Sequence, residues 1–158
     1  MKLARVGVMA AVVLAVATLA FAQAKPDFSG TWTFVPAADA PAGGGGGGRG
    51  GGGGPMTVTQ TGDTLTIERT MMDNKITSTY KLDGTEGSYK RMGRGGNEVE
   101  VKATAKWDAN KLVITEKAPG RGGEMMETTQ TWSLDATGML VIEGTGGRGP
   151  TKRTYKKG

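Results

Sequence analysis

The stretch FSGTW, residues 28–32, decides how the rest of the chain is interpreted. It follows an apolar N-terminal segment and opens the first alternating run, with Phe28 and Trp32 as apolar anchors on either side of Gly30. The runs after it are short, rich in Thr, Val and Ile, and bounded by turn residues, which is typical of β-strands. We therefore expect Trp32 to plug the base of a barrel that these strands close.

Residues 1–24 have the pattern of a signal peptide, with Lys2 and Arg5 before an apolar run over 6–21. A small-x-small cleavage rule is satisfied at Ala24 and two residues earlier at Ala22. We expect cleavage at one of these sites and a secreted or periplasmic protein without stable membrane insertion. An uncleaved N-terminal anchor is the alternative. Residues 25–158 are then a single domain by size.

Composition excludes several classes of function. The chain of 158 residues contains no His and no Cys, so imidazole bases, thiol nucleophiles and most zinc sites are ruled out. A net charge of +5 is too modest for a dedicated nucleic-acid binder. We expect no enzymatic activity, no metal site, no cofactor and no nucleic-acid partner; the oligomeric state is left open.

The dominant periodicity after residue 24 is two, and helical spacing is missing. It is clearest over 98–107, where Val99, Val101 and Trp107 share one face. We expect ten strands, with ends uncertain by a few residues: Ser29–Val35, Met56–Thr61, Thr64–Thr70, Lys75–Leu82, Glu86–Met92, Asn97–Trp107, Lys111–Lys117, Glu124–Leu134, Gly138–Glu143 and Thr151–Lys157.

Eight of the nine connections between these strands fall into two classes, and the ninth, a tight turn around Asp73-Asn74, breaks the pattern. Four are tight and carry an aspartate, as hairpin turns do: Asp63, Asp83, Asp108 and Asp135. Four are loose and carry Gly-Arg-Gly, centred on Arg49, Arg94, Arg121 and Arg148. In an up-and-down meander, alternate connections lie at one end, so we expect a tight base and a basic mouth. Pairing of the first strand with the last would hide the sheet edges and close an all-β barrel.

The segment 27–32 resembles the Gly-x-Trp signature of lipocalins and other calycin-type barrels, and also small exported bacterial lipocalin-like proteins that begin with Phe-Ser-Gly-Thr-Trp. The resemblance implies that Trp32 packs at the closed end under a cation from the last strand, for which Arg153 is the candidate. It also implies that residues 36–55 partly cover the open end. Ten strands match the fatty-acid-binding branch of calycins better than eight would.

The inward faces carry small or polar residues among apolar ones, which leaves room for one small ligand. Arg69 and Gln130 could orient the polar end of such a ligand. The alternative is that side chains or water fill the space. The ligand-binding residues we predict are Arg69, Tyr80, Thr128, Gln130, Met72, Met126 and Arg121, and the barrel-closing pair is Trp32 with Arg153.

Three features of the mouth each allow two interpretations. The loop arginines could meet an anion or form a solubilising rim. Six methionines near the mouth could hold a soft metal, or could fill gaps and line an apolar entrance. The glycine-rich loop over 37–55 could be a flexible lid or a plain linker.

The sequence thus predicts an exported lipocalin-like barrel that binds a small apolar or amphipathic, lipid-like ligand, with an acidic head favoured by the basic mouth. The alternative is a ligand-free envelope protein with a filled barrel, whose strand edges or loops make structural contacts.

Overall fold

Antiparallel strands form one continuous sheet in the computed structural model, which describes residues 24–37, 54–71, 74–93, 96–120, 122–145 and 149–158. The ten strands are β1 (Gly30–Val35), β2 (Met56–Gln60), β3 (Thr64–Met71), β4 (Asn74–Lys81), β5 (Gly87–Met92), β6 (Glu98–Asp108), β7 (Lys111–Pro119), β8 (Met125–Leu134), β9 (Leu140–Thr145) and β10 (Thr151–Lys157). The predicted strands are confirmed, with ends that shift by about two residues, within the usual uncertainty of boundaries. No helix among the described residues is long and apolar enough to cross a membrane.

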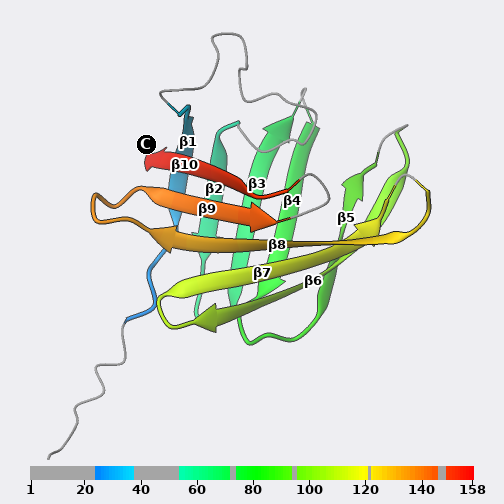
Figure 1. Ribbon diagram of the computed structural model, residues 1–158, viewed down its shortest axis with the longest axis horizontal. Helices are drawn as coiled ribbons and strands as arrows, with labels where there is room; N and C mark the ends of the chain where they lie inside the picture. Colours follow the sequence, from blue (N-terminus) through cyan, green and yellow to red (C-terminus); the bar gives the residue numbers. More distant parts are fainter. Residues whose placement is uncertain (1–23, 38–53, 72–73, 94–95, 121, 146–148) are drawn as a thin grey trace, which may run out of the picture.

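The strand order is that of an up-and-down meander whose ends meet. The sheet runs β4-β3-β2-β1-β10-β9-β8-β7-β6-β5, so β1 pairs with β10 as expected. Trp32 lies opposite Lys157, and Phe34 lies opposite Tyr155. Figure 1 shows β1–β4 running nearly upright, with β6–β10 crossing in front of them at a steep angle. The result is a nearly closed all-β barrel, which confirms the predicted fold class.

The barrel is interrupted between β4 and β5, where the sequence predicts a tight hairpin around Asp83. This prediction is wrong, because β4 and β5 are the two ends of the sheet order and share no ladder. The chain after β4 bonds elsewhere: Leu82 N–H donates to Asp63 O at 2.8 Å, and Gly84 N–H donates to Ala105 O at 3.0 Å. The Asp-Gly pair therefore turns the chain onto β6, and two unpaired strand edges are left at this seam.

Alternating burial along the strands explains why they form. On β6 the buried side chains are Val101, Ala103 and Ala105, while the intervening residues are more exposed. β7 buries every second residue from Leu112 to Ala118 in the same way. Period-two burial of this kind is what holds a strand against a core on one face.

Aromatic residues fill the base, the end of the barrel at which the aspartate turns lie. Phe28 is fully buried, stacks on Trp107 with ring centroids 5.9 Å apart, and meets Trp132 edge-on at 5.8 Å. Trp32 is 1% exposed and donates its indole N–H to Phe28 O at 2.8 Å. The expected plug is therefore made by Phe28 and Trp32 together.

The segment before β1 is tied to β2 by Gln60. Its side chain accepts from Phe28 N–H at 3.1 Å and donates to Pro26 O at 3.1 Å. Gln60 N–H in turn donates to Ser29 Oγ at 3.0 Å. These bonds satisfy backbone groups outside the sheet and fix Phe28 beneath the core.

The cation beside Trp32 is Lys157, where the sequence interpretation assigned Arg153. Lys157 Nζ lies 5.7 Å from the centroid of the Trp32 ring. The register explains the difference, since Trp32 is opposite Lys157, whereas Arg153 is opposite Ile142 and four residues nearer the mouth. Gly30, at φ +135°, leaves the path of Lys157 open: a Cβ there would stand 2.5 Å from Lys157 Cε.

Candidate functional site

A buried carboxylate forms the centre of the barrel's polar interior. Of the charged residues that the structure describes, Glu116 on β7 is the buried one, at 7% exposed. It shares the inward face of β7 with Leu112 and Ile114. The sequence prediction did not include Glu116. Its even spacing from Leu112 and Ile114, which puts all three on one face of the strand, could have indicated that it is buried.

Two tyrosines donate to one oxygen of this carboxylate. Tyr80 on β4 donates to Glu116 Oε1 at 2.6 Å, and Tyr89 on β5 donates to the same atom at 2.8 Å. The two rings meet edge-on with centroids 5.8 Å apart. Since β4 and β5 are the unpaired edges, these side chains bridge the seam that the backbone leaves open.

Burial raises the pKa of Tyr80 well above its usual value near 10, and the negative charge of Glu116 raises it further. The pKa of Tyr89 is raised for the same two reasons, again with burial as the larger. Both hydroxyls therefore stay protonated and act as donors to the carboxylate.

The second oxygen of Glu116, Oε2, has a weaker polar contact than Oε1. Arg91 Nη1 lies 3.9 Å from Glu116 Oε2, which makes an ion pair but not a hydrogen bond, and Arg91 is 42% exposed. The residues beside Glu116 on the neighbouring strands are Ala103 and Thr128. Beyond Ala103 lies Gly87, where an added Cβ would meet no atom within 4 Å. Small side chains thus occupy the positions beside Glu116 on the neighbouring strands.

A second polar cluster lies nearer the mouth, around Arg69 on β3. Arg69 Nη2 contacts Met56 Sδ at 3.5 Å, while its Nε is buried without a hydrogen-bond partner among the described residues. Burial raises the pKa of Tyr155, and the positive charges of Arg69 and Arg153 act against that rise. The positive charges of two guanidinium groups therefore act on the phenol of Tyr155.

The predicted ligand-binding residues divide between these clusters and other places. Arg69 and Tyr80 belong to the two clusters, and Thr128 is opposite Glu116. Gln130 Oε1 accepts from the indole N–H of Trp132 at 3.3 Å, and Met126 is 40% exposed. The residues that lie outside the described part of the chain are Met72, Arg121 and the other three loop arginines, Arg49, Arg94 and Arg148.

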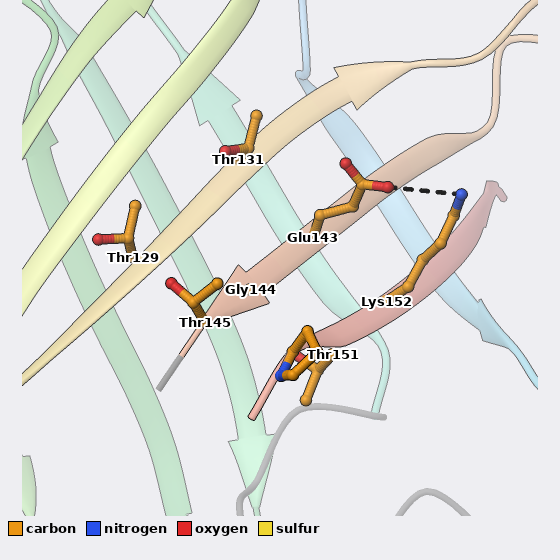
Figure 2. A pocket seen from close by; sticks show the side chains of 8 residues that line it. Thr129, Thr131, Glu143, Gly144, Thr145, Thr151 and Lys152 are labelled. Atoms are coloured by element: carbon orange, nitrogen blue, oxygen red, sulfur yellow. Dashed lines mark ion pairs between the residues drawn. The ribbon is translucent and has the colours of Figure 1, made fainter. Parts of the chain in front are cut away.

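A hollow of about 450 Å³ is found on the outer face of β8–β10. Figure 2 shows Thr129 and Thr131 on β8, with Glu143 and Lys152 on the next two strands; the latter two form an ion pair at 3.5 Å. These side chains alternate with the buried ones along β8 and β9 and therefore lie on the outer face. The hollow is thus separate from the barrel interior. Within the described ranges, no group of three His, Cys, Asp or Glu residues is placed to hold a metal ion.

Comparison with known proteins identifies the fold alone. No family model and no curated protein sequence matches the chain. Among solved structures it is similar to one titled REP1-NXSQ fatty acid transporter, with 13% identity and a TM-score of 0.54. The similarity covers 82% of this chain and 95% of that one. It agrees with a calycin-like barrel.

Proposed function

We propose that this protein is an exported, non-enzymatic binding protein whose barrel holds a small amphipathic ligand with an acidic head. The observation that carries the proposal is Arg69, whose buried Nε has no hydrogen-bond partner among the described residues. A buried donor without a partner costs about 1–3 kcal/mol, and a bound anion would remove that cost. Arg153, whose charge acts on Tyr155 as that of Arg69 does, would add positive charge.

The remainder of the interior suits the apolar part of such a ligand. The wall around Arg69 carries Met56 and Ile76 at the paired positions on the two neighbouring strands. Burial of apolar surface contributes about 25 cal/mol per Å² before the cost of ordering the ligand. The name of the structural neighbour, a fatty acid transporter, supports the same ligand class.

We also propose that the protein has no catalytic activity, and the protonation of the two buried tyrosines supports this. Burial and the charge of Glu116 raise the pKa values of Tyr80 and Tyr89, so these hydroxyls are poor bases and poor nucleophiles. Export through a signal peptide cleaved after Ala22 or Ala24 is proposed on the sequence pattern, and mass spectrometry of the mature protein would establish the cleavage site.

Binding is tested by native mass spectrometry of protein purified from its own envelope, followed by melting curves with lauric acid and with lauryl alcohol. We expect a lipid-sized adduct and a rise in melting temperature that is larger for the acid. A ligand-free mass together with unchanged melting across a panel of fatty acids would overturn the proposal.

The role of Arg69 is tested with Arg69→Met and a matched control. A hydrogen bond to a charged group is worth about 1.5–3 kcal/mol, so Arg69→Met should weaken acid binding by about 10- to 100-fold and leave the alcohol unaffected. Lys152→Met removes one positive charge from the outer face, where Lys152 pairs with Glu143 at 3.5 Å, and should change neither affinity.

The second candidate is a ligand-free envelope protein that makes contacts through its sheet edges. The unpaired edges of β4 and β5 favour it, because unpaired strand edges accept a further strand. This candidate gains support if the purified protein carries no ligand and instead co-purifies with a defined envelope protein, and if charged substitutions on β4 abolish that association.

A further inference from the structure

The two carboxylate oxygens of Glu116 differ in the hydrogen bonds that they accept. Oε1 accepts both tyrosine hydroxyls, whereas among the described residues Oε2 meets only Arg91 Nη1, at 3.9 Å. A carboxylate oxygen can accept two hydrogen bonds, so Oε2 can still accept a donor. Bridging the seam between β4 and β5 uses Oε1 and leaves Oε2 available.

The interior beside Glu116 has space for a group that could fill this role. Its register neighbours are Ala103 and Thr128, and the next residue in that row is Gly87. Gly87 precedes Tyr89 by two residues, so both face inward, and no atom lies within 4 Å of a Cβ built on Gly87. A row of small residues next to a carboxylate oxygen that can still accept a donor is the arrangement expected of a binding subsite.

The charges around Glu116 Oε2 determine which kind of hydrogen-bond donor could bind there. Arg91 is ion-paired with Glu116, so the cluster already holds one positive and one negative charge. An ammonium group would be repelled by Arg91 and would have to lose its hydration. A neutral hydroxyl would donate to Oε2 without adding charge.

The distance between Arg69 and Glu116 determines where along the ligand chain that hydroxyl would lie. Arg69 is opposite Ile76 on β4, and Tyr80, which contacts Glu116, is four residues further along the same strand. Four residues of strand span about 13 Å. A hydroxyl at the far end of a medium-length chain would reach Glu116 while its acid head remained at Arg69.

We propose that Glu116, held by Tyr80 and Tyr89, forms a second polar subsite, and that the ligand is a fatty acid with a hydroxyl group far from its carboxylate. This inference rests on the proposed binding function and specifies its ligand class. Arg69 recognises the acid, the apolar walls hold the chain, and Glu116 Oε2 accepts the hydroxyl.

The test compares lauric acid, omega-hydroxylauric acid and alpha-hydroxylauric acid by titration calorimetry on the mature protein. We expect the omega-hydroxy acid to bind about tenfold or more tightly than the other two. Equal affinity for the three acids would overturn the inference and leave the proposed function intact. Binding of none of them would overturn both.

Two variants locate the preference at Glu116. Glu116→Gln retains the shape and an acceptor for the tyrosines but loses the charge, so the preference for the omega-hydroxy acid should shrink several-fold. Glu127→Gln, at an exposed residue that pairs with Lys117 at 3.3 Å, is the matched control and should retain the preference. A preference unchanged in Glu116→Gln would overturn the inference.

Gly87→Ala tests the space independently of the carboxylate. The added methyl meets no atom within 4 Å, so the melting temperature should not fall. We expect weaker binding of the omega-hydroxy acid and little change for lauric acid. If both acids bind as in the wild type, the hydroxyl does not occupy this space and the inference fails.

Discussion

Tyr80 on β4 donates a 2.6 Å hydrogen bond to Oε1 of Glu116 on β7, at the side of the barrel where backbone pairing stops. Tyr89 on β5 donates to the same oxygen at 2.8 Å. One carboxylate therefore joins the two unpaired edges of the sheet, and side chains do there what a ladder of backbone bonds does elsewhere.

The first prediction concerns the strength of this bridge. Tyr80→Phe removes a buried hydrogen bond to a charged acceptor and should lower the free energy of unfolding by about 1.5–3 kcal/mol. Tyr89→Phe should cost less, because Tyr89 is less buried and its bond is longer. Urea unfolding with a common m-value is the measurement. A loss below about 0.5 kcal/mol for Tyr80→Phe would contradict the bridge, and equal losses for the two substitutions would contradict the predicted order.

The second prediction is a loss of stability at alkaline pH. All three tyrosines of the chain have raised pKa values in the fold, each through burial. Below about pH 10 the hydroxyls are protonated in both states, and their contribution to stability is fully present. Above that pH the unfolded chain loses protons that the folded one retains, so stability falls as pH rises towards the folded pKa values.

Tyr80 should contribute the largest single share of this slope, since its pKa is raised furthest. Denaturant titrations of the wild type and Tyr80→Phe between about pH 9 and pH 11 provide the comparison. The variant should have the shallower dependence. Parallel curves would show that groups other than Tyr80 control the alkaline limb.

The third prediction concerns the acid limb and the turns at the base. Asp135 accepts from Thr137 Oγ1 at 2.7 Å, Thr137 N–H at 2.8 Å and Met139 N–H at 3.0 Å, and these bonds lower its pKa below 3.8. Asp83 has the same arrangement with Thr85. A lowered folded pKa gives stability that is present above the unfolded value and is lost as pH falls through the folded one.

Asp135→Asn retains an acceptor but removes the titrating group, so its melting temperature should change less than that of the wild type between about pH 5 and pH 2. Asp63→Asn, in another turn at the base, is the control and should follow the wild type. An Asp135→Asn curve that falls as steeply as the wild type would exclude this turn as a source of acid sensitivity.

Most of the fold could be predicted from the sequence because period-two alternation is a local signal, and strong turn residues separate the strands. The seam could not, because Asp83-Gly84 is a good hairpin sequence locally, and long-range bonds such as the one from Gly84 to Ala105 on β6 redirect the chain. Glu116 was missed because a charged residue in a strand is ordinarily assigned to the outer face. Its burial depends on two tyrosines from strands that are distant in the sequence.

The barrel-closing pair shows why register is the weakest part of a sequence prediction. Arg153 and Lys157 are both inward-parity cations on β10, and only the pairing with β1 determines which one reaches Trp32. The polar cluster around Arg69 was found in part, because Arg69 stands on the face of β3 that also carries Leu65 and Ile67. Arg153 lies four residues nearer the mouth than Lys157, and it is therefore closer to that cluster than to Trp32.

The last prediction tests this assignment at the base. Trp32→Ala should cost about 3–5 kcal/mol, since the ring is 1% exposed and its removal leaves a large cavity beside Phe28. In double-mutant cycles Lys157→Ala should couple to Trp32→Phe by about 0.5 kcal/mol, the value for an exposed cation on an aromatic face. Arg153→Ala should be additive with Trp32→Phe and should instead weaken binding of lauric acid. Coupling of Arg153 to Trp32, with no effect of Arg153→Ala on the acid, would reverse both assignments and place Arg153 at the base.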